Sequence, residues 1–167
     1  MNFDPELLAL AKQCVDENRK AGRFATTAES CTGGLVSAAL TEIAGASDMF
    51  GCSFVTYSNR AKMALLDVPG ELLKAHGAVS EPVARAMAAG ALAKSGASVA
   101  VAISGVAGPG GGSAAKPVGT VAFACAVRGV PGGEGATITA ETRHFGDLGR
   151  AEVRRQAALV ALRMLLP

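Results

Sequence analysis

Residues 28–34, which read AESCTGG, combine two nucleophile types with the expected start of a helix. Ser30 and Cys31 stand side by side after a short strand candidate. The free N–H groups in the first turn of a helix attract anions, so a nucleophile placed there lies beside donors for a tetrahedral oxyanion. The segment therefore predicts a hydrolytic site on Ser30, although helix capping by Ser30 or Thr32 would use the same residue types.

Lys62 is the candidate general base for Ser30. It follows Tyr57, the one tyrosine of the chain, and lies near the start of an expected helix. Ser–Lys pairs are an established variant of the catalytic triad, but the pKa of such a lysine must fall from about 10.4 to roughly 7. Burial or a neighbouring cation such as Arg60 or Arg143 would lower it. Tyr57 is then a candidate hydrogen-bond donor or proton relay. The alternative is a solvated lysine and a half-buried tyrosine.

Cys31 is the alternative nucleophile. Cysteine is intrinsically more reactive than serine, but it needs a partner that stabilises the thiolate, commonly a histidine. The chain has two histidines, His76 in an expected loop and His144 in a Thr-rich strand candidate. Neither lies in a segment with a catalytic signature, so the sequence favours serine.

Five residues of the turn besides Ser30 are candidate substrate-binding groups. Glu29 is its one acidic residue, and it either orients Lys62, binds a substrate hydroxyl or favours the helix N-terminus. Gly33 and Gly34 would let a substrate approach the backbone closely. Together with those of Cys31 and Thr32, their N–H groups are the candidate oxyanion donors.

A glycine-rich segment, residues 104–112 (SGVAGPGGG), follows a fully apolar strand candidate. Ligands bind at the carboxyl ends of strands in open α/β sheets, and consecutive N–H groups in such a loop can form an anion-binding nest. Gly105 and Gly108 are therefore candidate ligand-binding residues, with Lys116 and Arg143 as candidate phosphate partners. The segment is neither a Walker loop nor a dinucleotide fingerprint, and a plain surface loop is the alternative.

The elements that must position these residues alternate along the chain. Apolar periodicity and turn residues predict the following pattern. Helices are expected from Pro5 to Gly22 and over 35–43, 59–66, 81–95 and 146–166, and strands over 24–28, 50–57, 98–104, 119–127 and 136–145, with a turn at Gly132-Gly133. This order predicts one domain over 1–167, an α/β fold, specifically a three-layer α/β/α sandwich with a mixed, mostly parallel sheet of about five strands. The last two strands are expected to be antiparallel, with the 98–104 strand central and the 136–145 strand near an edge.

Composition limits the classes of partner and cofactor. Half the residues are hydrophobic and 21 are glycine, which predicts a closely packed core rather than disorder. A net charge of +2 predicts neither nucleic-acid binding nor attachment to a membrane surface. The four cysteines and two histidines show no zinc-ligand spacing, so no metal or other cofactor is expected. With no signal peptide or apolar span visible, we expect a cytoplasmic protein.

The turn motif resembles one family when it is taken with two others, residues 56–62 (TYSNRAK) and residues 104–109 (SGVAGP). The chain looks like the CinA C-terminal domain family in its stand-alone form, from about residue 5 to 165. The resemblance implies a three-layer α/β/α fold, no metal, and deamidation of nicotinamide mononucleotide to nicotinate mononucleotide and ammonia in pyridine-nucleotide recycling. It implies that Ser30 is the nucleophile, with Lys62 and Tyr57 as catalytic partners. It also implies a strand-end hydroxyl at Ser104 and a family arginine at Arg143.

The competing class is a binding module without catalysis. The same helix start and glycine loop would suit a nucleotide or phosphate sensor associated with competence or DNA damage. Small-residue helices such as 81–95 also favour packing against a second subunit, so we expect a homo-oligomer, a dimer or higher. The discriminating observation is turnover of nicotinamide mononucleotide as opposed to binding alone.

Overall fold

The computed structural model describes residues 3–129 and 135–167. The expected turn at Gly132-Gly133 lies outside this part of the chain. The elements follow in the order α1 (Pro5–Lys20), β1 (Ala25–Glu29), α2 (Leu35–Thr41), a 3-10 turn η1 (Ala46–Asp48), β2 (Phe50–Val55), α3 (Asn59–Leu66), α4 (Gly70–His76), α5 (Glu81–Ser95), β3 (Val99–Gly105), β4 (Thr120–Arg128), β5 (Ala136–His144) and α6 (Arg150–Leu165). The helices and strands expected from the sequence are present, and η1 and α4 are additional.

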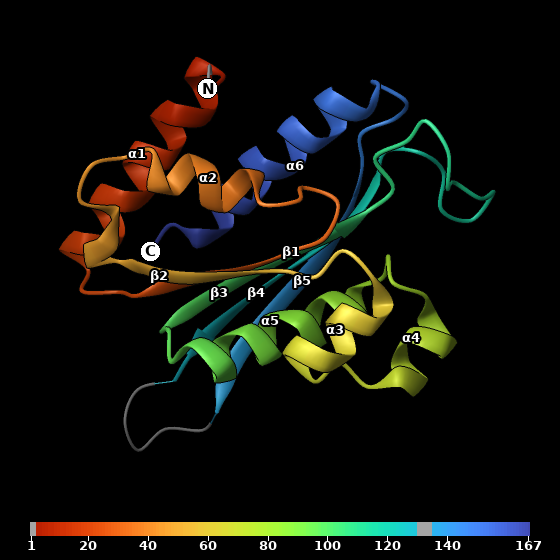
Figure 1. The fold of residues 1–167 in the computed structure, drawn as a ribbon, viewed down its shortest axis with the longest axis horizontal. Helices are drawn as coiled ribbons and strands as arrows, with labels where there is room; N and C mark the ends of the chain where they lie inside the picture. The colour runs from red at the N-terminus through yellow and green to blue at the C-terminus, as the bar shows by residue number, and fades with distance from the viewer. Residues whose placement is uncertain (1–2, 130–134) are drawn as a thin grey trace.

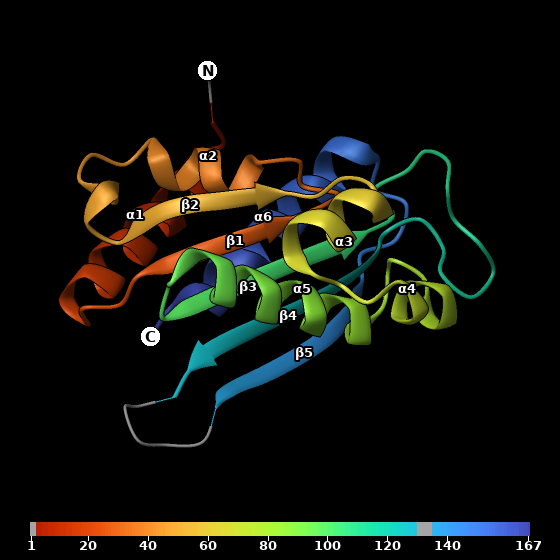
Figure 2. The same cartoon turned by 60° about the horizontal axis from the view of Figure 1, so that its bottom comes forward.

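The fold has three layers. Helices α1, α2 and α6 lie on one face of the sheet and α3, α4 and α5 on the other, as Figures 1 and 2 show. Helix α6 packs on β3 and β4, whereas α5 crosses all five strands. Within the described residues, none of the helices has the length and apolarity needed to cross a membrane.

The sheet has the strand order β2-β1-β3-β4-β5. Strand β1 runs parallel to β2 and β3, whereas β3–β4 and β4–β5 are antiparallel. The expectation of a mostly parallel sheet is therefore wrong, because only two of the four pairings are parallel. The physical reason lies in residues 106–119, which contain no helix. A parallel connection normally crosses one face of the sheet through a helix, so β4 instead runs back beside β3.

Alternation along the central strands separates two apolar cores. On β3 and β4 the larger side chains, such as Ile103 and Phe123, pack toward α1, α2 and α6. Their neighbours in sequence are alanines, and these pack toward α5. Successive side chains of a strand point to opposite faces, so one face of the sheet is lined with small residues. Helix α5 therefore lies close to the sheet, as the alanine-rich composition predicts.

Close packing extends to the helix that follows β2. A Cβ atom on Gly90 of α5 would lie 2.0 Å from the carbonyl oxygen of Leu66, at the end of α3. Only glycine allows this approach, which fixes α3 against α5. The position of Lys62, one turn earlier in α3, depends on this contact.

Candidate active site

The ends of the three parallel strands bring the predicted motifs together. Glu29, the last residue of β1, is in register with Val55 of β2 and Ile103 of β3. The pattern continues one residue further, because the Ser30 N–H donates to the Ile103 carbonyl (2.9 Å) and the Thr56 N–H donates to the Glu29 carbonyl (2.8 Å). The residues that follow each strand therefore lie at one edge of the sheet.

Ser30 and Lys62 form a direct pair. The Lys62 Nζ donates to the Ser30 Oγ at 3.0 Å and to the Thr56 carbonyl at 2.8 Å. Lys62 lies in the first turn of α3, which Ser58 caps by accepting a hydrogen bond from the Ala61 N–H (3.1 Å). The lysine side chain is 1% exposed and Ser30 is 8% exposed. The pair has the distance that proton transfer from a serine hydroxyl requires.

Burial makes the Lys62 amine a weaker base than an exposed lysine. It lowers the pKa of Lys62 from 10.5 to about 8, against a smaller opposing effect of the Cys31 thiol. A solvated ammonium is stabilised by water, and burial removes that stabilisation. The cause is burial and not the neighbouring cation that we had considered as an alternative. A pKa near 8 leaves about a tenth of the lysine neutral at pH 7, and the neutral form is the one that can act as a base.

Cys31 is placed and tuned differently. It is buried beside Ser30, and burial raises the pKa of its thiol from 9.0 to about 11. The thiolate, which is the nucleophilic form, is therefore rare at neutral pH. Of the two histidines, His76 is the last residue of α4 and does not lie in a loop. The Nδ1 atom of His144 forms a hydrogen bond with the Thr120 hydroxyl (3.2 Å). The geometry thus supports serine over cysteine.

Glu29 holds the start of α2. Its fully buried carboxylate accepts hydrogen bonds from the N–H groups of Gly34 (3.0 Å), Val36 (3.2 Å) and Ser37 (2.8 Å). It also accepts one from the Thr27 hydroxyl (3.3 Å). Of the three roles considered for Glu29, this is the favourable interaction with a helix N-terminus. The N-terminus of α2, which was predicted to bind an anionic group of a ligand, therefore binds the Glu29 carboxylate instead.

This arrangement narrows the choice of oxyanion donors. The Gly34 N–H is bound to Glu29, and the Gly33 N–H donates to the Ser30 carbonyl (3.0 Å). The N–H groups of Cys31 and Thr32 donate to no oxygen atom in the described part of the chain. Of the four groups predicted, these two are the ones left to bind a substrate oxygen.

Ser104 and Gly105 form the floor of the site at the end of β3. The Ser104 hydroxyl, 1% exposed, donates to the Ala78 carbonyl (2.8 Å). A Cβ atom on Gly105 would lie 2.6 Å from Val121 Cγ2 and 3.0 Å from Cys31 Sγ. Glycine is required here because the backbone passes close to the nucleophile turn.

Tyr57 and the glycine loop are joined by an arginine that the sequence analysis missed. Arg150, at the start of α6, donates to the Tyr57 hydroxyl (2.8 Å) and to the Gly108 carbonyl (2.9 Å). Tyr57 is 61% exposed, so it lies at the mouth of the site. A pocket of about 230 Å³ lies between these elements, lined by Ser30, Cys31, Tyr57, Asn59, Lys62, Ala78, Val79, Ser104, Gly105, Ala107 and Arg150. Asn59 is a second residue that the sequence analysis did not single out.

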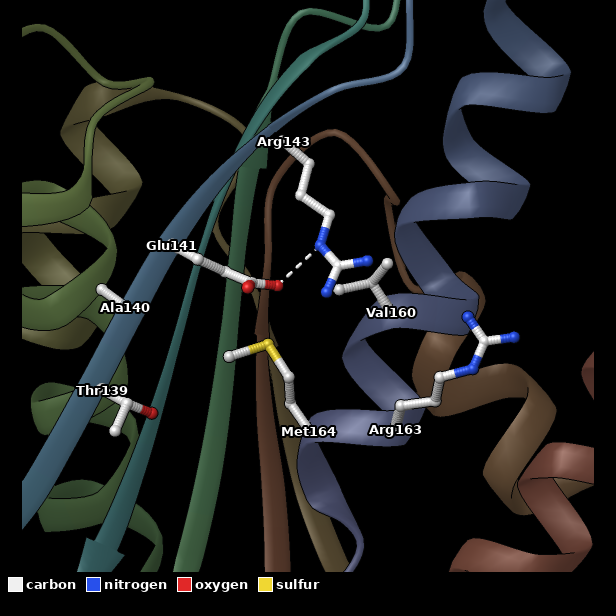
Figure 3. Close-up of a pocket in the computed structure, with 7 residues that line it drawn as sticks. All are labelled: Thr139, Ala140, Glu141, Arg143, Val160, Arg163 and Met164. Carbon is white, nitrogen blue, oxygen red and sulfur yellow. Dashed lines mark hydrogen bonds and ion pairs between the residues drawn. The ribbon is translucent and has the colours of Figure 1, made fainter.

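Arg143 does not join this group. It lies on β5, where its Nε donates to the Glu141 carboxylate at 2.7 Å. As Figure 3 shows, it lines a separate groove between β5 and α6, together with Arg163 and Met164. The cation that the structure brings to the Ser30 pocket from this end of the chain is Arg150. Lys116, the other candidate phosphate partner, donates through Nζ to the His76 carbonyl.

The fold and site define a class: a three-layer α/β/α domain with a buried Ser–Lys pair at the carboxyl edge of its parallel strands. Comparison with known proteins agrees with this class. The family model for the CinA C-terminal domain matches residues 7–167, so the chain belongs to the CinA family.

Three relatives illustrate the family. The chain is 51% identical to the nicotinamide-nucleotide amidohydrolase PncC of Escherichia coli, over 97% of this chain and 94% of that one. It is 52% identical to a CinA-like protein of Mycolicibacterium vanbaalenii, over 87% of this chain but 33% of that protein. The crystal structure of the competence/damage inducible protein CihA from Agrobacterium tumefaciens superposes with a TM-score of 0.92 at 45% identity, covering 99% and 96% of the two chains. The chain thus spans about a third of the length of the first curated relatives and nearly all of the other two.

Proposed function

We propose that this protein deamidates nicotinamide mononucleotide to nicotinate mononucleotide and ammonia, with Ser30 as nucleophile and Lys62 as general base. The observation that carries the proposal is the buried Lys62 Nζ at 3.0 Å from the Ser30 Oγ. The substrate class is supported by the 51% identity to the E. coli protein named nicotinamide-nucleotide amidohydrolase. Amide hydrolysis by acyl transfer is chemistry that a Ser–Lys pair performs.

In this mechanism neutral Lys62 takes the Ser30 proton as Oγ attacks the carboxamide carbon. The tetrahedral intermediate carries its negative charge on the former carbonyl oxygen, which the N–H groups of Cys31 and Thr32 would stabilise. Protonated Lys62 then gives its proton to the amide nitrogen, and ammonia leaves as the C–N bond breaks. The resulting ester on Ser30 is hydrolysed by water, with Lys62 again accepting and returning a proton.

The walls of the pocket suit an anionic substrate. No carboxylate side chain is among its described lining residues, and Arg150 lies at its mouth. In the glycine loop, the N–H groups of residues 107, 108 and 110–112 donate to no acceptor in the described part of the chain. A phosphate bound between Arg150 and this loop would hold the ring amide near Ser30, with Tyr57 at the mouth. Binding energy from this remote group would then assist the chemical step.

The wider expectations stay predictions. We propose that residues 1–167 act as one domain without a metal or organic cofactor, in the cytoplasm and as a homo-oligomer. Helix α5, which we expected to favour subunit packing through its small residues, uses its buried alanines against the sheet. These alanines are therefore not the surface through which an oligomer would form.

The test is release of ammonia from nicotinamide mononucleotide by the purified chain, with nicotinate mononucleotide identified by mass. Ser30→Ala should lose roughly 10³-fold or more in rate, whereas Cys31→Ala should retain most activity. The reverse result, with loss in Cys31→Ala and activity retained in Ser30→Ala, would move the nucleophile to Cys31. Tight nucleotide binding by calorimetry with no ammonia release would instead support the competing class, a non-catalytic binding module.

A further inference from the structure

A second set of hydrogen bonds to the nucleophile turn comes from α6 and is partly buried. The Arg154 side chain donates through Nε to the Cys31 carbonyl (3.2 Å) and through Nη2 to the Thr32 carbonyl (2.8 Å). These carbonyls belong to the Cys31–Thr32 and Thr32–Gly33 peptide groups, whose N–H groups are those of Thr32 and Gly33. The guanidinium has a fixed planar geometry, so two simultaneous hydrogen bonds fix both acceptors in direction as well as in distance.

An acidic and a basic side chain thus hold the turn, the first through backbone N–H groups and the second through backbone carbonyls. Glu29 binds the N–H groups of Gly34, Val36 and Ser37, while Arg154 binds the carbonyls of Cys31 and Thr32. The end of the Arg154 side chain also lies beside Gly33, since its Nη2 is 3.6 Å from the place where a Cβ on Gly33 would stand. Neither charge takes part in the proton transfers proposed above.

We infer that Arg154 is a positioning residue for the proposed reaction, fixing the turn that follows Ser30 and, with it, one of the two candidate oxyanion donors, the Thr32 N–H. A trans peptide group is planar, and its C=O and N–H point in opposite directions. When Arg154 holds the Cys31 carbonyl toward α6, the Thr32 N–H must point away from α6. A cation on the carbonyl also polarises the peptide, which makes its N–H a stronger donor. The inference rests on the proposed function for its kinetic part and on the turn geometry for its structural part.

The alternative is that Arg154 only ties α6 to the turn and stabilises the fold. Its neighbour Arg155 provides a matched control, since it lies in the same helix but pairs with Asp4, Glu6 and Glu152 instead of the turn. A merely structural role would make the two arginines equivalent in kinetics. A positioning role separates them.

The kinetic experiment compares Arg154→Ala, Arg154→Lys and Arg155→Ala with the unmodified protein on nicotinamide mononucleotide. We expect kcat to fall about 10- to 100-fold in Arg154→Ala, the size of effect that a small misplacement of reacting groups produces, with KM changed less than about threefold. Arg154→Lys should recover part of the loss, because an ammonium reaches one carbonyl at a time. Arg155→Ala should keep kcat even where its unfolding midpoint falls. A kcat within twofold of the unmodified protein in folded Arg154→Ala would overturn the inference.

A second measurement does not depend on the substrate. Amide signals of residues 31–34 in ¹⁵N spectra should shift and exchange faster with solvent in Arg154→Ala, and stay unchanged in Arg155→Ala. If the unmodified protein releases no ammonia, the proposed function fails, while these spectra still decide whether Arg154 holds the turn. Unchanged amide signals in Arg154→Ala would refute the positioning role whatever the activity.

Discussion

Lys62→Met removes the buried amine while keeping an unbranched side chain of similar length. The magnitude of its effect follows from the pKa of Lys62, which burial lowers from 10.5 to about 8. Each tenfold change in the proton affinity is worth about 1.4 kcal/mol, so the buried ammonium costs roughly 3 kcal/mol of folding free energy below its folded pKa. The methionine variant does not carry this cost.

The sign depends on which state binds the proton. Between about pH 8 and 10.5 the unfolded lysine is protonated and the folded lysine is neutral, so the stability of the unmodified protein rises with pH in this window. The variant lacks this contribution. It also leaves the Thr56 carbonyl without its lysine donor, a cost of about 1–3 kcal/mol that does not depend on pH.

The readout is therefore the change with pH in the stability difference between the two proteins, measured by urea unfolding at about pH 7 and about pH 9.5. The stability of Lys62→Met relative to the unmodified protein should decrease by about 2 kcal/mol between these conditions. The other titrating groups are present in both proteins, so their contributions to the stability difference largely cancel. A difference that stays constant within about 0.5 kcal/mol, the uncertainty of such comparisons, would refute a depressed pKa for Lys62. Ammonia release by the same variant should be nearly abolished while it remains folded.

Three further predictions concern rate and packing. The value of kcat/KM should rise with pH, reach half of its plateau near pH 8 and level off above about 9, with about a tenth of the plateau at pH 7, because only neutral Lys62 accepts a proton; a flat profile from about pH 6.5 to 9 would contradict this. Gly90→Ala should lower both the unfolding midpoint and kcat, since its Cβ would stand 2.0 Å from the Leu66 carbonyl oxygen; calorimetry and steady-state rates should show no such change for Gly135→Ala, whose Cβ has nothing within 4 Å. Glu29→Gln should destabilise the fold by about 2 kcal/mol in urea unfolding, because the amide keeps one acceptor oxygen in place of the two that receive three N–H groups; an unchanged midpoint would argue against these hydrogen bonds stabilising the fold.

Local patterns were sufficient for most elements. The apolar run at 98–104 predicted a central strand, and β3 lies in the middle of the sheet. The motif residues Ser30 and Lys62 were paired by their types and by the family resemblance, and the structure brings them to 3.0 Å. Helix α4 was missed because its seven residues offer only two leucines, too few to show a helical period.

Long-range contacts were harder to predict. Arg150 and Arg154 carry no local motif, and their role depends on where α6 begins. The strand directions could have indicated their position. Two successive antiparallel pairings make β5 parallel to β3, so β5 ends, and α6 begins, at the edge of the sheet that holds Ser30. The expectation of a mostly parallel sheet concealed this. The role of Glu29 could not be chosen from sequence, since it depends on which way a buried side chain turns.

The two charges that hold the nucleophile turn bear on how such a domain diversifies. Ser30 lies on backbone fixed from both sides, whereas the loop that follows Ala107 at the pocket is exposed at most positions from 109 to 117. Changes in that loop leave the hydrogen bonds of Glu29 and Arg154 untouched. Selection can therefore change which nucleotide or amide enters the pocket without moving the reacting atoms. Substrate preference can evolve independently of the chemical step.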